Sequence, residues 1–152
     1  MLVIAIGNPS RGDDALGPLF LEAIARETQG EVAAGAIELL TDFQLQIEHA
    51  LDIEGRERVC FVDAAMRLDA PFELRKVSPA LDDTYTSHAM SPGAVLETCR
   101  RIHGSAPEAW VLAIGGEAFE LGEGLSARAN RNLSEAVDAL VHGPLREVLG
   151  LG

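Results

Sequence analysis

Apolar runs without polar alternation constrain the fold of this chain more than any other feature. Leu2–Ile6 is wholly apolar and ends at Gly7-Asn8-Pro9, Arg58–Asp63 is apolar from its second residue to its final acid, and Trp110–Ile114 is a third run. Strands that are apolar on both sides are typical of parallel sheets covered on both faces. The three runs therefore predict a buried, mostly parallel sheet.

Segments with helical spacing of apolar residues separate these predicted strands. We expect helices over about 17–27, 44–51 and 91–103, and a long helix from Ser126 that Pro144 kinks or breaks. Two more strands are expected over 36–40 and, half exposed or at an edge, over 72–77. The alternation predicts a three-layer α/β/α sandwich with a mostly parallel central sheet of about five strands, phosphorylase/hydrolase-like in type. No linker or repeat divides the 152 residues, so we expect a single domain over 1–152.

Charge and composition exclude several classes of protein. The chain has 24 Asp and Glu against 12 Lys and Arg, a formal net charge of -12, which repels nucleic-acid phosphates. No apolar stretch approaches the roughly 18–20 residues of a membrane-spanning helix, so no membrane role is expected. Cys60 and Cys99 lie in apolar surroundings without the spacing of metal ligands. We expect reduced core thiols in a cytoplasmic protein.

Reactive side chains occur where the predicted strands end. In open α/β sheets the ligand site lies outside the carboxyl ends of the strands. Asp13 and Asp14 follow the first strand, Asp63 ends the third, and His88 lies in the loop before the 91–103 helix. Glycines before a helix can bind phosphate, but here two aspartates oppose an anion and the lysine of a P-loop is missing. The loop is better suited to a cation.

Each of these residues also has a simpler interpretation. Asp14 is equally suited to cap the following helix with Asp13 on a surface turn, Asp63 can cap its own segment, and a loop residue such as His88 is often only solvated. The remaining histidines are weaker candidates, on predicted helices or their ends: His49, His103 and His142. Two carboxylates and an imidazole together suit a borderline divalent metal, or a general base, acid and electrostatic stabiliser for hydrolysis. The residue types leave both roles open.

Several short motifs, in order along nearly the whole chain, resemble those of the nickel–iron hydrogenase maturation endopeptidases. Ala5-Ile6-Gly7-Asn8 with Asp13-Asp14 and Gly17 resembles the N-terminal motif of that family. Phe61-Val62-Asp63-Ala64 resembles the second acidic motif, and Ser87-His88 the histidine motif. Gly116-Glu117 and Gly124-Leu125-Ser126 resemble the final loop and the start of the last helix.

The resemblance implies a hydrolase that removes the C-terminal extension of a nickel–iron hydrogenase large-subunit precursor after nickel insertion. It implies that Asp14, Asp63 and His88 form a catalytic and metal-binding triad facing nickel carried by the substrate. Another divalent metal in the resting enzyme, and the choice between aspartic-type and metal-dependent catalysis, stay open. Contacts to the substrate are expected from Gly7, Asn8, Asp13, Asp42 and Glu117. We expect a cytoplasmic monomer.

The chain departs from the family pattern at three places. Ala5 and Ala15 stand where glycines are common, and residues 40–46 lack the glycine-rich turn of many members. Asp42 in this loop is either an acid that contacts substrate or a helix N-cap. Two other functions stay in view: a non-catalytic, metal-sensing maturation chaperone, and a peptidyl-tRNA hydrolase-like esterase. The opening through Pro9 also resembles the esterase, but the residues that follow it and the negative charge oppose a tRNA substrate.

Overall fold

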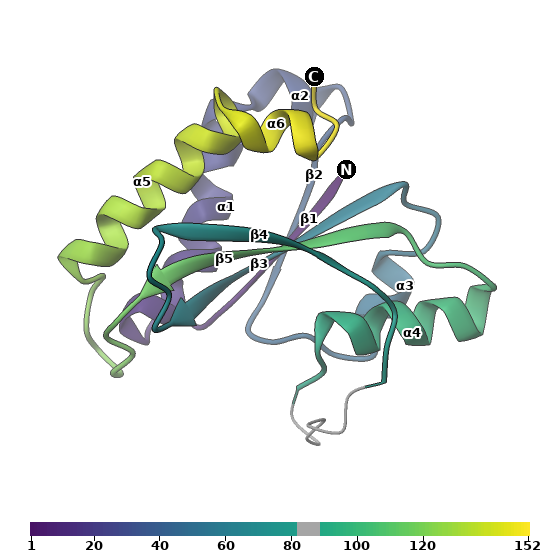
Figure 1. Ribbon diagram of the computed structural model, residues 1–152, viewed down its shortest axis with the longest axis horizontal. Coiled ribbons are helices and arrows are strands. Elements are labelled where there is room, and N and C mark those ends of the chain that lie inside the picture. Colours follow the sequence, from purple (N-terminus) through teal and green to yellow (C-terminus); the bar gives the residue numbers. More distant parts are fainter. Residues whose placement is uncertain (82–88) are drawn as a thin grey trace.

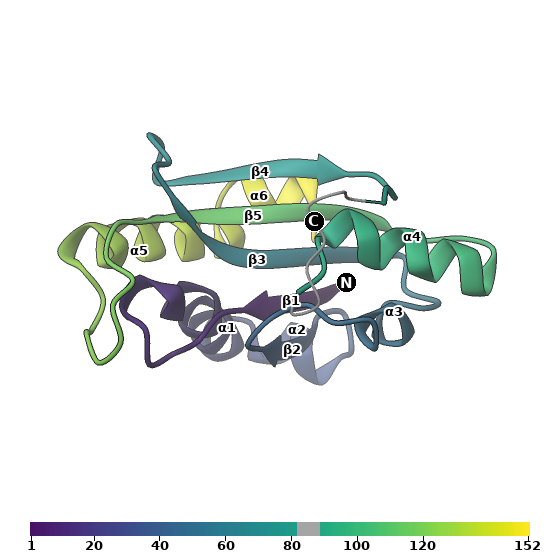
Figure 2. The same ribbon diagram turned by 90° about the horizontal axis from the view of Figure 1, so that it is seen from below.

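A five-stranded sheet forms the centre of the protein in the computed structural model, which describes residues 1–81 and 89–152. The strands are β1 (Leu2–Ile6), β2 (Glu38–Asp42), β3 (Arg58–Met66), β4 (Phe72–Val77) and β5 (Glu108–Gly116). Their order across the sheet is β2-β1-β3-β5-β4, with β2 and β4 at opposite edges (Figure 2). All neighbours pair in parallel except β4, which is antiparallel to β5. The predicted mostly parallel sheet is confirmed.

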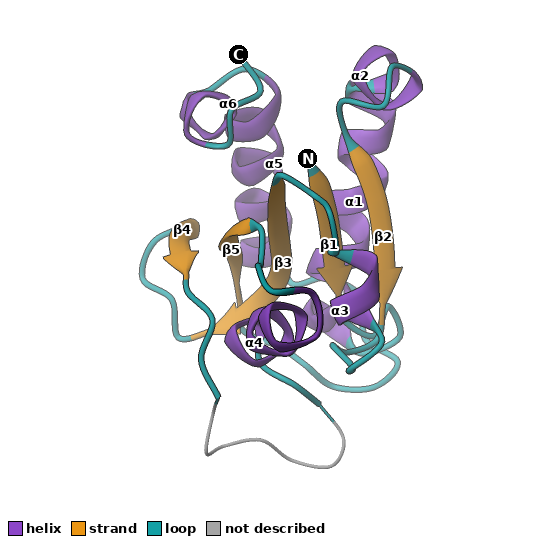
Figure 3. Ribbon diagram, turned by 90° about the vertical axis from the view of Figure 1, so that its right-hand side faces the viewer, coloured by secondary structure: helices purple, strands orange, loops and turns teal. Residues whose placement is uncertain are grey.

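Helices cover both faces of this sheet (Figures 1 and 3). One layer holds α1 (Leu16–Glu27), α2 (Gln29–Ala33), α5 (Ala127–Val141) and α6 (Pro144–Val148). The opposite layer holds α3 (His49–Asp52) and α4 (Pro92–His103). The predicted three-layer α/β/α architecture is therefore confirmed. Both chain termini lie at one end of the strands, away from the carboxyl ends of the parallel strands (Figures 1 and 3).

Two apolar cores explain why β1 shows no polar alternation. Val3 and Ala5 belong to the core on the α1 and α5 side, whereas Leu2 and Ile4 belong to the core on the α3 and α4 side. Successive side chains of a strand point to opposite faces, so a strand between two helical layers is apolar throughout. The central position of β1 thus follows from its composition.

The structure corrects the bounds of several predicted elements. β2 begins two residues later than expected, because the register with β1 starts at the pair Leu2↔Glu38. The expected helix over 44–51 is reduced to α3, since the Gln46 N–H donates to His49 Nδ1 (2.8 Å) and holds a loop before it. β3 continues three residues beyond Asp63 and pairs with β5 as far as Met66. Asp63 thus lies within the strand rather than at its end.

Side-chain capping fixes the starts of α4 and α5, which begin next to the residues predicted to start them. The Ser91 hydroxyl accepts from the Ala94 N–H (3.1 Å) at α4, and the Ser126 hydroxyl accepts from the Ala129 N–H (3.1 Å) at α5. α5 ends at Val141, before Pro144, so the predicted break is also confirmed.

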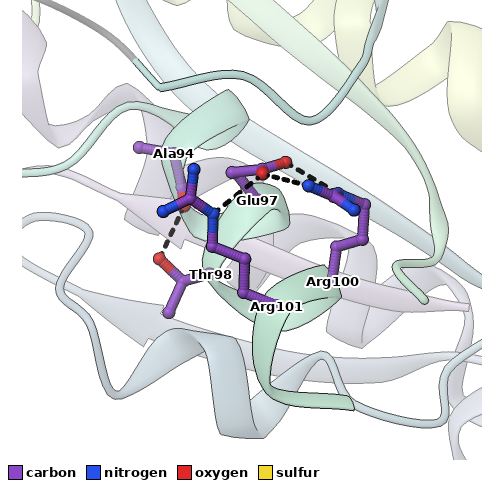
Figure 4. A network of polar contacts seen from close by, with 5 residues as sticks. All are labelled: Ala94, Glu97, Thr98, Arg100 and Arg101. Atoms are coloured by element: carbon purple, nitrogen blue, oxygen red, sulfur yellow. Dashed lines mark hydrogen bonds and ion pairs between the residues drawn. The ribbon is translucent and has the colours of Figure 1, made fainter. Parts of the chain in front are cut away.

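A cluster of charged side chains joins Glu97 to the next turn of α4 (Figure 4). Glu97 accepts from Arg100 Nε (2.9 Å) and from Arg101 Nε (3.0 Å), although the residue is only 6% exposed. The hydrogen bond from Arg100 is the largest cause and, together with that from Arg101 and the charges of both arginines, lowers the pKa of Glu97 to about 2 against the opposing effect of burial. Glu97 therefore stays ionised at neutral pH.

Both cysteines are buried and free, as predicted for core thiols. Burial raises the pKa of the Cys60 thiol to about 12, so it is unreactive at neutral pH. Within residues 1–81 and 89–152, no helix offers the length and apolar character that crossing a bilayer demands.

Candidate active site

A cleft of about 270 Å³ opens at the carboxyl ends of the parallel strands. It lies between the loop after β1, the loop after β2, residues Phe61 and Asp63 of β3, and the residues before α4. Its apolar lining includes Ile6, Phe43, Leu45, Phe61, Met90 and Val111. Of the described lining residues, three are charged: Asp14, Asp63 and Arg75. The cleft therefore lies at the carboxyl ends of the parallel strands, where the sequence predicts a ligand site.

The chain reversal after β1 brings Asp14 to the cleft. Gly7 has φ +148°, and a Cβ at this position would lie 2.0 Å from the Asp14 carbonyl oxygen. Only glycine allows the short helix η1 (Gly12–Ala15) to fold back this closely on the strand. The Asn8 N–H then donates to Asp14 Oδ2 (2.7 Å) and orients the carboxylate. The N-cap interpretation of Asp14 is wrong, because the N-cap of α1 is Ala15.

Asp63 is held on β3 in a mostly buried position. Its Oδ1 accepts from the Ala64 N–H (2.8 Å). Burial raises the pKa of Asp63 to about 7, the Ala64 hydrogen bond opposes this rise, and the negative charge of Asp14 adds to it. The two carboxylates are therefore close enough to interact, and Asp63 exchanges its proton near neutral pH.

Asp13 is structural rather than exposed on a turn. The residue is fully buried. Its carboxylate accepts from the N–H groups of Glu117 (2.8 Å), Ala118 (3.0 Å) and Ser126 (2.7 Å), and from the Ser126 hydroxyl (2.7 Å). Burial alone would raise the pKa of Asp13, but these hydrogen bonds together lower it. The surface-turn interpretation is wrong: Asp13 ties the β1 loop to the segment before α5.

Asp42 ends β2 and does not line the cleft, and its N-cap interpretation is wrong because the N-cap of α3 is Glu48. Its Oδ1 accepts from the Phe43 N–H (2.7 Å), and its Oδ2 lies 3.4 Å from His49 Nε2. Because His49 Nδ1 accepts from the Gln46 N–H, a neutral imidazole carries its proton on Nε2, facing Asp42. This pair holds the loop that presents Phe43 and Leu45 to the cleft.

The other expected substrate contacts divide between the cleft and the loops beside it. Gly7 lines the cleft. Asn8 and Glu117 are not among its lining residues: the Asn8 carbonyl Oδ1 accepts from the Ser10 N–H (2.9 Å), and Glu117 is exposed. Both stabilise the loops around Asp13 and Asp14.

His88, the third member of the expected triad, lies outside the described residues. In the part of the chain that the structure describes, no three His, Cys, Asp or Glu side chains form a group that could hold a metal ion. Asp14 and Asp63 supply two oxygen ligands, so a divalent metal in the resting enzyme would need a further ligand, for which the sequence offers His88.

Arg75 is a cleft residue that the sequence did not indicate. It lies on β4 opposite Val111 of β5, and residues in register share a face of a sheet. Asp63 and Phe61 are in register with Ala113 and Val111 on the other side of β5, so they lie on this same face. The pattern of β4 separates two faces, but only the pairing with β5 shows that one of them meets the cleft.

Comparison with solved structures identifies the fold. The search found no match to a family model and no match to a curated protein sequence. Solved structures match over nearly the full chain. The maturation protease HycI of Thermococcus kodakarensis superposes with a TM-score of 0.71 at 20% identity, covering 98% of this chain and 91% of the other. The maturating endopeptidase HybD of E. coli gives 0.69 at 21%, covering 97% and 92%.

A third match is the hydrogenase 2 maturation peptidase of a Thaumarchaeota archaeon, with a TM-score of 0.65 at 20% identity, covering 99% of this chain and 98% of the other. This chain has the fold of the hydrogenase maturation proteases. Within that maturation protease fold, the chain places a protonatable carboxyl group, Asp63, beside a second carboxylate, Asp14, in a partly apolar cleft. Such a pair can take and return a proton during hydrolysis.

Proposed function

We propose that this protein is an endopeptidase that removes the C-terminal extension of a nickel–iron hydrogenase large-subunit precursor after nickel insertion. The observation that carries the proposal is the full-length match in fold to proteins named as hydrogenase maturation proteases. The cleft adds the chemistry, because Asp14 and Asp63 meet where the strand ends gather.

In the proposed reaction, ionised Asp63 removes a proton from a water molecule. The water oxygen bonds to the carbonyl carbon of the scissile peptide, the carbon–nitrogen bond breaks, and protonated Asp63 returns the proton to the leaving amine. A group with a pKa near 7 is suited to both transfers at neutral pH. Burial, with a smaller contribution from the carboxylate of Asp14, keeps the proton affinity of Asp63 high.

Nickel enters this proposal as part of the substrate. Carboxylate oxygens of Asp14 and Asp63, with the imidazole of His88, would form a mixed oxygen and nitrogen set that suits a borderline divalent ion. The metal would then identify a loaded precursor and place its tail beside Asp63. We place this reaction in the cytoplasm and expect one copy of the chain to carry it out.

The test is incubation of the purified protein with nickel-loaded and nickel-free precursor, followed by intact-mass spectrometry. The wild type should shorten only the loaded precursor, and Asp63→Asn should reduce the rate by at least about 100-fold while the protein stays folded. Asp69→Asn, an exposed loop substitution, is the control. An unchanged precursor mass with the wild type would contradict the protease and favour a chaperone, and equal cleavage of both precursors would contradict recognition of nickel.

A further inference from the structure

A second cavity, of about 540 Å³, lies next to the acidic cleft, between the end of β4 and the first turn of α4. Its walls include Ser78, Ala80 and Gly93. The Ala80 N–H donates to the Gly93 carbonyl (3.0 Å), which ties the segment after β4 to the helix and gives the cavity a built wall. Small side chains leave room here for a few residues of a peptide.

Arg75 stands at the junction, because it lines both the acidic cleft and this second cavity. Lys76 also borders the second cavity, but its ammonium lies 5.6 Å from the centre of the Trp110 ring and 3.2 Å from Glu108 Oε1, a carboxylate partner. Of the two cations in the described lining, Lys76 is thus paired with Glu108, whereas Arg75 is not. The charged residues of the described lining, Arg75 and Lys76, are both cations, so this lining favours an anionic group.

Arg75 lies on the same face of the sheet as Asp63, because the two residues are in register with Val111 and Ala113 of β5. Arg75 thus lies between the second cavity and the carboxyl group at which the proposed reaction takes place.

We infer that Arg75 is a substrate-positioning residue that binds a carboxylate of the C-terminal extension, and that the second cavity receives this part of the peptide. The inference rests on the endopeptidase function proposed above. Of the two sides of the scissile bond, the extension is the short one and always ends in a carboxylate, whereas the other side is a folded subunit. The carboxylate comes either from that terminus or from an Asp or Glu side chain in the extension. A guanidinium binds both with the same two-pronged geometry.

The first experiment measures cleavage of the nickel-loaded precursor by the wild type, Arg75→Gln, Arg75→Lys and the control Arg131→Gln, an exposed arginine of α5 in the opposite layer. Loss of a hydrogen bond to a charged group corresponds to about a tenfold to hundredfold effect. We expect KM to rise at least tenfold in Arg75→Gln with kcat changed less than threefold, partial rescue in Arg75→Lys, and no change in Arg131→Gln.

The second experiment measures binding of the synthetic extension peptide to the same variants by calorimetry. One peptide has a free terminus, one has an amidated terminus, one has its acidic side chains replaced by amides, and a fourth has both changes. The tenfold difference between wild type and Arg75→Gln should vanish for whichever peptide lacks the bound carboxylate, which identifies its source. This inference alone is overturned if Arg75→Gln cuts the precursor as well as the wild type does. It is also overturned if the affinity difference between wild type and Arg75→Gln persists for the peptide that lacks every carboxylate. A wild type that cuts nothing overturns the proposed function as well.

Discussion

Burial controls the proton of Asp63 and links the chemistry of this residue to stability. Its pKa is raised from 3.8 to about 7 in the folded protein. Below pH 4 the group is protonated in the folded and the unfolded state. As the pH rises from 4 to 7 the unfolded state loses its proton first, so the free energy of unfolding falls through this range and levels off above it.

We therefore expect Asp63→Asn to be more stable than the wild type at pH 8 by at most about 4 kcal/mol, since each pKa unit corresponds to about 1.4 kcal/mol. The difference should shrink steadily toward pH 4. Urea unfolding from pH 4 to pH 8 measures it, with Asp69→Asn as the control. A stability difference that does not depend on pH would contradict a raised pKa at Asp63.

Asp13 is also an aspartate, but its pKa is lowered in the folded protein, whereas that of Asp63 is raised. Its carboxylate accepts four hydrogen bonds that favour the ionised form. We expect Asp13→Ala to reduce the free energy of unfolding by more than about 3 kcal/mol, because buried donors on the segment before α5 lose their partner. Its contribution should fade as the pH drops below about 4, through the lowered pKa. Thermal unfolding tests this, and a variant as stable as Asp69→Ala would show that Asp13 is not structural.

The loop between β2 and α3 is the element that carries one wall of the cleft. Its conformation depends on a buried histidine, since His49 accepts from the Gln46 N–H and faces Asp42. A second link is the Met90 N–H, which donates to the Leu45 carbonyl (3.1 Å) and joins this loop to the residues before α4. The wall is thus held from both sides, although it contains little regular structure.

We expect His49→Phe to destabilise the protein by about 1–3 kcal/mol, because the new side chain fills a similar space but leaves the Gln46 N–H without its acceptor. The KM of cleavage should rise more than kcat falls, since the loop with Phe43 and Leu45 lines the cleft while Asp63 stays in place. Urea unfolding and steady-state kinetics measure the two effects. His142→Phe, an exposed position after α5, serves for comparison, and equal behaviour of the two variants would remove His49 from this role.

At the scale of the whole molecule, the net charge of -12 opposes the compact state through self-repulsion. Salt screens exposed charges with a Debye length of about 30 Å at 0.01 M and about 8 Å at 0.15 M. We expect Tm to rise by a few degrees when NaCl is increased from 10 to about 150 mM. A Tm that falls over this range would indicate that attractive ion pairs, such as Arg146 with Glu31, outweigh the repulsion.

The sequence by itself determined the architecture, because a strand between two helical layers must be apolar on both sides. The apolar run Leu2–Ile6 accordingly matches β1, and the helices predicted to start at Ser91 and Ser126 match α4 and α5. The same reasoning indicated Asp14, which follows β1, and Asp63, since the ligand site of a parallel sheet lies at the carboxyl ends of its strands. That Asp63 lies within β3 rather than at its end came only from the pairing of β3 with β5. His88 stays a prediction of the sequence.

Only the tertiary structure decided what neighbouring acids do. Asp13 and Asp14 are adjacent in sequence, yet one binds buried backbone N–H groups from about 100 residues away while the other faces the cleft. Arg75 enters the cleft only through the antiparallel register of β4 with β5. Both outcomes depend on contacts between distant segments, and local sequence patterns carry no information about such contacts.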